Sequence, residues 1–297
     1  MAIPPPTLRQ LRSLIAAVET GSVSAAARAL HISQPAASQQ LRELEHALAV
    51  RLLERGSGTT RPTAAGAAVL VHARRVQVAL DDLVAAAAAF QGGETGRVRL
   101  GTGATACIHL LPPLLARMKA RMPGLEIIIA TGNTPDMLRK VQDGALDVAL
   151  VTQLGRLDRS LETRQVHQEA MLAYAPATLL PEAAALRPAA LSRQPLILYE
   201  SGGTTRGVVD AWFRRAGQTP RPIMELGSVE AIKLLAESGL GATILPASAI
   251  VAPPPDMAVR ALRPALTRCL AVVLRRDKLL DLGLRVCLEE LGTLQAG

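Results

Sequence analysis

The N-terminal part of the chain repeats its apolar residues with the period of an α-helix, and glycine or serine marks the predicted helix ends. In the first predicted helix the apolar face carries Leu8, Leu11, Ile15 and Val18. Gly21 would end this helix, and Ser22 is placed to cap the next one. The second helix is rich in small residues, which allow two helices to approach closely; these are Ala25, Ala26 and Ala29, followed by Leu30.

A third helix is predicted after a turn at His31 and Ile32. Ser33 can cap it, and Pro35 falls in its first turn, where the missing N–H of proline costs no hydrogen bond. Its expected buried stripe is Ala37, Leu41, Leu44 and Leu48. Its expected outer face carries Gln34, Ser38, Gln39 and Arg42. Such a face suits the DNA major groove, in the manner of a helix-turn-helix, but it also suits an ordinary three-helix bundle with a solvated side.

A glycine-rich segment over residues 55–62 follows the third helix, with Arg55 and Arg61 near its two ends. In one interpretation the segment is the hairpin wing of a winged helix-turn-helix, and the arginines lie near the DNA backbone. In the other it is a plain solvent-exposed loop.

Thr63 is placed to cap a long helix over residues 64–90. Its apolar residues are spaced 4, 3, 4, 3, 4 and 3 apart, a heptad seam made of Val69, Ala73, Val76, Leu80, Leu83, Ala87 and Phe90. A single helix cannot bury this seam by itself. We expect it to pair with a second copy of the chain; the alternative is that it packs against the remainder of its own chain.

After a glycine-rich joint at residues 91–96 the pattern changes to short apolar runs that alternate with helical segments. This alternation predicts an α/β sheet with crossover helices, about 200 residues long and large enough for two lobes. The predicted strands are 98–100, 125–130, 146–151, 196–199, 223–226 and 239–246. The predicted helices are 111–121, 135–142, 205–216 and 229–238.

Basic residues are concentrated in the helical N-terminal part. Lys and Arg total 33 against 25 acidic residues, which gives the chain a net charge of +8. Residues 1–75 hold nine arginines and four glutamates, so +5 of that charge falls in the first quarter of the chain. This charge favours an anionic partner, and double-stranded DNA is the one that the helical motif fits. Aromatic residues make up only 2%, which argues against a fold that stacks single-stranded bases on aromatic rings.

The cysteines are few and scattered. Cys107, Cys269 and Cys287 form no disulfide framework, which fits a reducing compartment. The chain shows no signal-peptide pattern and no unbroken apolar run long enough to cross a bilayer, so we expect a cytoplasmic protein without a membrane partner. Cys107 is either an oxidant sensor or an inert thiol, and the inert thiol is favoured because residues 195–215 hold no cysteine to pair with it.

Several stretches together resemble LysR-type transcriptional regulators over essentially the whole chain. They are Ala25-Ala26, Ser33-Gln34-Pro35-Ala36-Ala37-Ser38-Gln39-Gln40-Leu41, Leu44-Glu45, Leu52-Leu53-Glu54-Arg55, Arg61-Pro62-Thr63-Ala64-Ala65-Gly66, Leu110-Leu111-Pro112, Gly144-Ala145-Leu146-Asp147-Val148-Ala149 and Gly239-Leu240-Gly241-Ala242-Thr243-Ile244-Leu245-Pro246. Some positions depart from the pattern, because members of the family often have Arg where Gln39 stands, Gly at Ala49, Pro at Arg51 and Phe at Leu53. The departure at Gln39 bears on base preference.

The resemblance implies a fold that combines α and α/β parts. A winged helix-turn-helix would occupy residues 1–62, a coiled-coil linker helix residues 63–92, and an effector domain residues 93–297. That domain would have two Rossmann-like lobes, similar to periplasmic binding proteins, with lobe I at about 93–162 and 266–297 and lobe II at about 163–265. The resemblance also implies homodimers that pair into homotetramers and a small-molecule effector bound between the lobes. RNA polymerase is the protein partner expected of such a regulator.

For the DNA contact the expected residues are Ser33, Gln34, Pro35, Ser38, Gln39, Arg42, Arg55 and Arg61. For the effector site, two strands run into turns of glycine and hydroxyl residues, at 102–105 and 201–205, where the carboxyl ends of strands in an open α/β sheet bind ligands. Position matching with the family selects Thr102, Thr105, Thr152 and Thr204, followed by Ser201 and Asn133. These N–H and O–H donors favour a small anion such as a carboxylate, although hydroxyls at these positions can also simply cap helices.

An enzyme is the main alternative. Gly101, Gly103 and Ala106 match the dinucleotide-binding fingerprint, which would suit a nucleotide-dependent oxidoreductase. That fingerprint needs an acidic residue at the end of the second strand, where this chain has Thr131, Gly132 and Asn133. No nucleophile elbow and no metal-binding spacing of His or Cys occurs, so we expect no catalytic residues, no metal and no cofactor.

Overall fold

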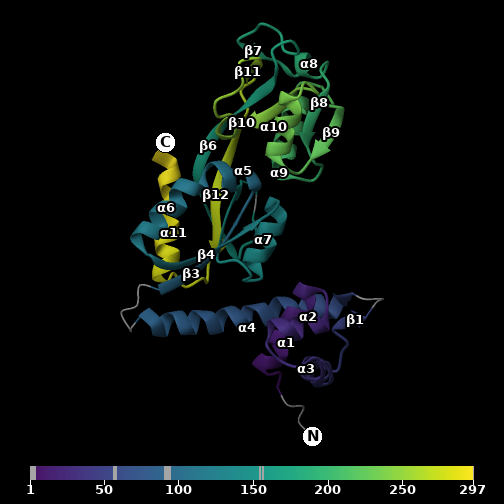
Figure 1. The fold of residues 1–297 in the computed structure, drawn as a ribbon, viewed down its shortest axis with the longest axis vertical. Helices are drawn as coiled ribbons and strands as arrows, with labels where there is room; N and C mark the ends of the chain where they lie inside the picture. Colours follow the sequence, from purple (N-terminus) through teal and green to yellow (C-terminus); the bar gives the residue numbers. More distant parts are fainter. Residues whose placement is uncertain (1–4, 56–58, 90–94, 154, 156, 297) are drawn as a thin grey trace. The chain divides into compact units, whose positions relative to one another are not determined.

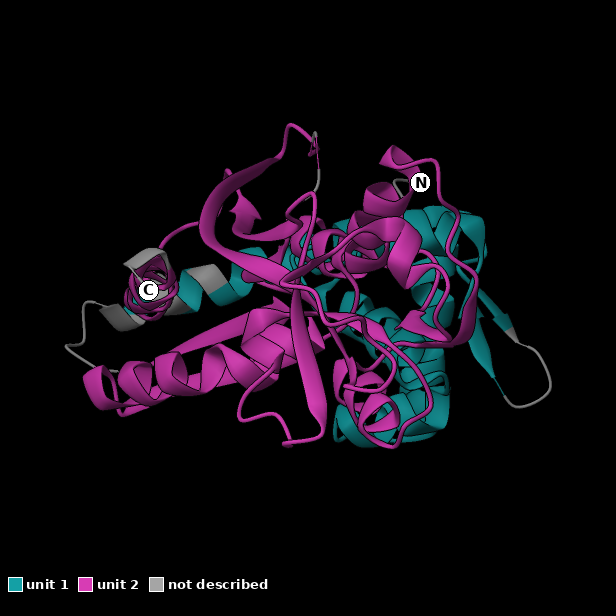
Figure 2. Ribbon diagram, turned by 90° about the horizontal axis from the view of Figure 1, so that it is seen from above, with its two compact units in different colours: residues 1–92, 143–145 teal, residues 93–142, 146–297 magenta. Residues whose placement is uncertain are grey.

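The structure is a computed structural model of the chain that describes residues 5–55, 59–89, 95–153, 155 and 157–296. It divides into two compact units (Figure 2). The N-terminal unit contains residues 1–92 with 143–145, and the C-terminal unit contains residues 93–142 with 146–297. No helix among the described residues is both long enough and apolar enough to cross a bilayer.

Three short helices open the N-terminal unit: α1 (Leu8–Thr20), α2 (Val23–Ala29) and α3 (Gln34–Leu48). The predicted end of α1 at Gly21 and the predicted caps of α2 and α3 are confirmed. Gly21 ends α1 with a positive φ of 66°, a left-handed conformation that glycine adopts at little cost. The Ser22 and Ser33 hydroxyls accept hydrogen bonds from the N–H groups of Ala25 and Ala36, and so cap α2 and α3.

The buried face of α1 differs from the prediction. Leu14 and Ala17 are fully buried, whereas Leu8 is 42% exposed and Leu11, Ile15 and Val18 are half-buried. The reason is tertiary, because α1 packs against three other helices of this unit and its buried face is centred between them. In α2 the buried small residues are Ala26 and Ala27, and Ala29 is exposed.

The predicted wing is a two-stranded antiparallel hairpin, β1 (Leu53–Arg55) and β2 (Thr60–Pro62), in which Glu54 pairs with Arg61. The long helix α4 (Ala64–Ala89) follows directly. Thr63 caps it, since its hydroxyl accepts the Gly66 N–H at 2.9 Å. Gly66 is required here because a Cβ at this position would lie 1.9 Å from the carbonyl oxygen of Leu52.

One long sheet organises the C-terminal unit, with strand order β4-β3-β5-β12-β6-β11-β7 and β10 paired to β6. The parallel core of its first half confirms the α/β prediction, with β3 (Thr95–Thr102) between β4 (Gly124–Thr131) and β5 (Val148–Thr152). The helices of this half are α5 (Ala104–His109), α6 (Leu111–Arg121), α7 (Thr134–Gln142) and α11 (Leu282–Gly292). They form a hydrophobic core on each face of the sheet.

The second half of the unit has its own core and a small parallel sheet, β8 (Leu196–Tyr199) with β9 (Pro222–Leu226). An isolated bridge between Leu196 and Ala242 brings β8 alongside the segment that enters β10 (Thr243–Pro246). The other elements are β7 (Ala185–Leu186), α8 (Pro188–Leu191), α9 (Thr204–Arg215), α10 (Val229–Glu237), the 3₁₀ turn η1 (Ala247–Ala249) and β11 (Met257–Leu262). A last 3₁₀ turn, η2 (Thr293–Ala296), follows α11.

Two long strands, β6 (Leu161–Pro176) and β12 (Thr267–Arg275), connect the lobes (Figure 1). Residues 161–170 of β6 pair with β12, and residues 171–176 pair with β10 and β11. The lobe boundary expected near residue 163 therefore falls inside a single strand, and strand pairing changes lobe at Met171. Both strands were missing from the sequence prediction, as were β11 and α11.

Candidate DNA-binding face and interlobe cavity

The outer face of α3 carries three exposed polar side chains, Gln34, Gln39 and Arg42. The Gln39 amide donates to Glu43 Oε1 at 2.8 Å, and its oxygen accepts from Arg42 at 2.8 Å. Gln10 on α1 donates to the other oxygen of Glu43 at 3.2 Å. The hydrogen bonds from Gln39 and Gln10 hold the pKa of Glu43 below its usual value. This network orients the Gln39 amide along the helix surface.

Ser38 does not lie on this outer face, and the expectation that it does is wrong. The residue is only 6% exposed, and its hydroxyl accepts a hydrogen bond from Gln34 at 3.1 Å. Ser38 stands three positions before Leu41, so it borders the apolar stripe, and the packing of both α1 and α2 against α3 widens the buried face. Ser38 therefore positions the Gln34 side chain.

The remaining predicted DNA-contact residues lie at the start of α3 and on the hairpin. Ser33 and Pro35 are exposed in the first turn of α3, and the Ser33 hydroxyl is already used as the helix cap. Arg61 is exposed on β2. Arg55 lies on β1, but its side chain falls outside the described part of the structure, as do residues 56–58 at the hairpin tip.

The predicted seam of α4 is divided between two environments. Its first residues are used inside the N-terminal unit, where Ala73 is 2% exposed and Val69 packs against the three-helix core. Two polar contacts also join α4 to α1: Arg74 forms an ion pair with Glu19, and Arg12 donates a hydrogen bond to Gln77. Leu80 of the seam is half-buried. The seam residues Val76, Leu83 and Ala87 are exposed, and so is Val84, which lies next to the seam. Phe90 lies outside the described residues.

A cavity of about 300 Å³ lies between the two lobes of the C-terminal unit. Four of the six predicted effector residues line it: Thr105, Asn133, Thr152 and Thr204. Thr105, Asn133 and Thr204 follow β3, β4 and β8, and Thr152 is the last residue of β5. These are the strand ends where the sequence placed the site. Thr131, Thr134 and Thr205 add further hydroxyls to the lining.

The other two predicted residues are not in the lining. Thr102 is fully buried, and its hydroxyl lies 3.4 Å from the Gly103 carbonyl oxygen. Ser201 is exposed and donates its hydroxyl to Glu225 Oε2 at 2.8 Å. Ser201 thus holds a carboxylate outside the cavity.

Four larger polar side chains of the lining were not predicted: Tyr199, Glu200, Arg206 and Arg268. Arg206 is 8% exposed and is fixed by Asp210 at 2.8 Å and Glu225 at 2.9 Å. Arg268 on β12 forms a buried ion pair with Glu169 on β6. No local sequence pattern identifies this pair, because its members are 99 positions apart and meet only through strand pairing. For Tyr199 the sequence offered one indication, its position at the end of a predicted apolar strand.

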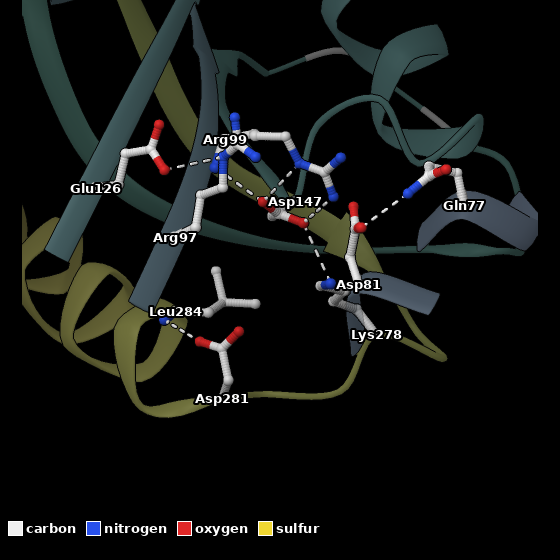
Figure 3. Close-up of polar contacts among 9 residues, drawn as sticks. All are labelled: Gln77, Asp81, Arg97, Arg99, Glu126, Asp147, Lys278, Asp281 and Leu284. Carbon is white, nitrogen blue, oxygen red and sulfur yellow. Dashed lines mark hydrogen bonds and ion pairs between the residues drawn. The ribbon is translucent and has the colours of Figure 1, made fainter. Parts of the chain in front are cut away.

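A buried charge cluster stabilises lobe I (Figure 3). Asp147 accepts hydrogen bonds from the Arg99 backbone at 2.8 Å and its guanidinium at 3.0 Å, and Lys278 lies 3.1 Å away. Burial alone would raise the pKa of Asp147, but the two cations and the bonds from Arg99 hold it below the usual value. The Gly-Ala-Leu-Asp stretch of the sequence therefore ties β3 to the start of β5.

The cysteines are free thiols in the structure. Cys107 on α5 is half-buried and does not line the cavity, although its neighbour Ala106 does. Burial raises the pKa of the Cys287 thiol to about 12, which keeps it protonated and unreactive.

The fold and the two sites together define a class of protein: a DNA-binding helix-turn-helix unit joined to a two-lobed ligand-binding domain. Family models agree. Residues 8–67 match a bacterial regulatory helix-turn-helix protein of the lysR family, and residues 91–295 match a LysR substrate binding domain. The chain belongs to the LysR family of transcriptional regulators.

Relatives and solved structures extend the match over nearly the whole chain. The HTH-type transcriptional regulator CbbR of Xanthobacter flavus is 35% identical over 93% of this chain and 85% of its own length. LrrA of Synechococcus elongatus, a probable HTH-type regulator, is 34% identical over 90% of both chains. Full-length CbnR in complex with its target DNA aligns with a TM-score of 0.68, 26% identity and 96% and 98% coverage of the two chains. A full-length OxyR variant from Pseudomonas aeruginosa, 23% identical over 97% and 98% of the two chains, shares the fold with a TM-score of 0.78.

These matches favour a DNA-binding regulator with an effector-binding domain over the oxidoreductase alternative. The glycines that suggested a dinucleotide fingerprint have a packing explanation at Gly101, where a Cβ would lie 2.5 Å from the Leu146 side chain. Strand β3 therefore packs closely against Leu146 at this position, whether or not a nucleotide binds.

Proposed function

We propose that the protein binds operator DNA through α3 and the hairpin, and that a small molecule in the interlobe cavity controls this binding. The observation that carries the proposal is the cavity itself, since hydroxyl groups that follow separate strands of both lobes converge on it. A ligand that bonds Thr105, Asn133 and Thr152 on one side and Thr204 on the other would stabilise one arrangement of the lobes over others.

In this proposal Gln34, Gln39 and Arg42 contact base edges in the major groove, with Ser38 holding Gln34 in place. Ser33 and Pro35 bring the start of α3 to a phosphate, and Arg55 and Arg61 contact the flanking backbone. Support comes from the exposure of these side chains on α3 and β2. The net charge of +5 over residues 1–75 adds to it.

We further propose that α4 pairs with α4 of a second copy through Val76, Leu80, Leu83 and Ala87, with Val69 and Ala73 supporting the helix from within. The exposed apolar residues on this helix support a homodimer, and dimers could pair into a homotetramer. As a regulator the protein would act at promoters with RNA polymerase as a partner, in the bacterial cytoplasm. It would act by binding, without catalysis and without a cofactor.

Selection from sheared genomic DNA by the purified full-length protein tests the proposal. We expect a small set of fragments to be enriched, and their affinity to fall about 10³-fold between 50 and 200 mM salt, because phosphate contacts release counterions. A ligand that raises the melting temperature should shift operator affinity in the wild type, and the shift should be lost in Thr204→Val. A protein that enriches no fragment and turns over a substrate would contradict the proposal.

A further inference from the structure

Two residues of the interlobe cavity lining each have a buried polar atom without a hydrogen-bond partner in the described structure: the Nη2 of Arg268 and the hydroxyl of Tyr199. Arg268 is 4% exposed and Tyr199 is 8% exposed, so water reaches neither of them freely. A buried polar group without a partner is unfavourable in a folded protein. A ligand in the cavity could supply what both groups lack.

Arg268 is held in place by Glu169, which stands opposite it in the pairing of β12 with β6. Its Nε donates to Glu169 Oε1 at 2.7 Å. Its Nη2 is also 2.7 Å from that oxygen but is not aligned for a hydrogen bond. The other oxygen of Glu169 accepts the Ser248 N–H at 3.0 Å. The ion pair therefore holds the Arg268 guanidinium in place and leaves its Nη2 as a donor without a hydrogen-bond partner.

Tyr199 lies close enough to this pair for both charges to affect it. Burial raises the pKa of its phenol well above the usual value, and the neighbouring Arg268 and Glu169 act on it in opposite directions. The hydroxyl therefore stays neutral and keeps its proton as a donor. The cavity lining thus includes two residues that each hold a donor without a partner.

A third feature also favours a negative ligand. The first residues of α9 line the cavity, and its N-cap, Gly203, has no side chain with which to cap the free N–H groups. The start of this twelve-residue helix carries roughly half a unit of positive charge.

The carboxylates at and around the site outnumber the arginines, however, and this limits the negative charge that a ligand can bring. Arg268 is paired with Glu169, Arg206 is paired with Asp210 and Glu225, and a further carboxylate, Glu200, is part of the lining. A head group with one negative charge fits these surroundings better than a phosphate with two charges.

The apolar part of the lining and the size of the cavity describe the rest of the ligand. The ligand's carbon skeleton would contact the apolar lining residues Leu150, Leu226, Val229 and Leu270. The volume of about 300 Å³ is at the small end of ligand pockets.

We propose that the effector is a small monocarboxylate whose head group accepts hydrogen bonds from Arg268 and Tyr199. The inference rests on the proposed function, because it names the ligand class of the same cavity. Arg268 and Tyr199 are then the residues that select a carboxylate over an uncharged ligand of the same shape.

The test is a thermal-shift and calorimetric comparison on the full-length protein. The probes are monocarboxylates of two to six carbons and benzoate, each beside its primary amide, together with succinate, inorganic phosphate and 3-phosphoglycerate. We expect at least one monocarboxylate to bind and its amide to bind at least tenfold more weakly. The inference is overturned if no monocarboxylate binds, if acid and amide bind equally, or if succinate or a phosphate compound binds most tightly.

Tyr199→Phe is the sharpest variant, because it removes only the unpartnered hydroxyl. We expect carboxylate affinity to fall at least tenfold, while the melting temperature of the ligand-free protein stays the same or rises. The chain's other tyrosine provides the matched control, since Tyr174 bonds Glu237 at 2.6 Å and is not in the cavity lining, so Tyr174→Phe should leave affinity unchanged. Equal affinity in Tyr199→Phe and wild type would overturn the inference.

A second variant replaces both charges of the buried pair, Arg268→Gln with Glu169→Gln, so that neither charge is left alone. It should lose carboxylate binding and keep the weak binding of the amide. Tyr199→Phe decides the question if this double variant fails to fold. Regulation by an uncharged ligand in the cavity would leave the proposed function standing and refute this inference. Carboxylate binding that depends on Tyr199, in a protein that selects no DNA, would support this inference and refute the proposed function.

Discussion

At the scale of single residues, position within a helix turn decides whether a polar side chain is available to a partner. Gln39 and Ser38 are neighbours in sequence, yet Gln39 is exposed while Ser38 is 6% exposed. Sequence periodicity placed both on one outer face because it cannot measure how wide the buried face becomes when two helices cover it. For the same reason the prediction did not find that the buried face of α1 is centred on Leu14 and Ala17.

Gln39→Ala should weaken binding to a selected operator fragment by about 1–3 kcal/mol, because an amide that pairs with adenine discriminates between bases by that amount. Fluorescence anisotropy with the selected fragment measures the change. Gln153→Ala changes another exposed glutamine, in the C-terminal unit; it is the control and should bind like the wild type. If both variants bind equally well, α3 does not contact bases at this position.

Gly66→Ala should destabilise the N-terminal unit by about 1–3 kcal/mol, because the added Cβ overlaps the Leu52 carbonyl oxygen and forces β1 away from α4. Circular dichroism during thermal unfolding measures the loss. Gly207→Ala within α9 provides the control, because nothing lies within 4 Å of its Cβ, and it should be neutral or stabilising by up to about 1 kcal/mol. Equal melting temperatures for the two variants would mean that the close approach at Gly66 is not tight.

At the scale of elements, local sequence predicted helix and strand identity well where caps and alternation were clear. The helices α1, α2, α3, α7 and α10 begin and end within a few residues of their predicted limits. Strand β6 (Leu161–Pro176) was missed because charged residues interrupt it, among them Glu162, Arg164 and Glu169. Strand β12 was missed although residues 269–274 form an unbroken apolar run. Long strands that cross between two lobes have faces in several environments, so their polarity does not alternate regularly.

Leu83→Glu on α4 should convert the proposed dimer to monomer, since it would place a charge in the centre of the apolar seam. Light scattering behind size-exclusion chromatography reports the mass. Ala67→Glu adds the same charge at another exposed position of α4, outside the seam, and should leave the dimer intact. A wild-type mass for Leu83→Glu would show that the exposed half of α4 does not hold the copies together.

At the scale of the whole molecule, buried ion pairs join segments far apart in the chain. Asp147 joins Arg99 and Lys278, and Glu169 joins Arg268. Both carboxylates have pKa values held below normal by their cationic partners against the opposing effect of burial. Because their folded-state pKa values are depressed, the stability they contribute is present above the unfolded values of 3.8 and 4.5 and is lost as pH falls through the folded values.

Asp147→Asn should therefore destabilise the C-terminal unit by about 3–5 kcal/mol at pH 7, since half-buried Arg99 and the buried Lys278 side chain lose the Asp147 carboxylate. The difference from wild type should shrink as the pH is lowered below 4. Denaturant unfolding followed by the fluorescence of Trp212, the single tryptophan of the chain, reports on this unit. Asp277→Asn is the control, because that carboxyl is 80% exposed beside Arg275 and its loss should cost less than about 1 kcal/mol. A pH-independent difference would rule out the buried charge as the cause.

The sequence by itself determined the helical order of the N-terminal unit, its caps, the hairpin, the α/β alternation, the resemblance to LysR-type regulators and four hydroxyl or amide residues of the cavity. These features depend on neighbours within one or two helix turns, or on which residues end a strand. Only the tertiary structure brought Tyr199 to the Arg268–Glu169 pair, buried Ser38 and turned Thr102 and Ser201 away from the cavity. These outcomes depend on which distant strands pair and how closely layers pack, and no local pattern of apolar and polar residues contains that information.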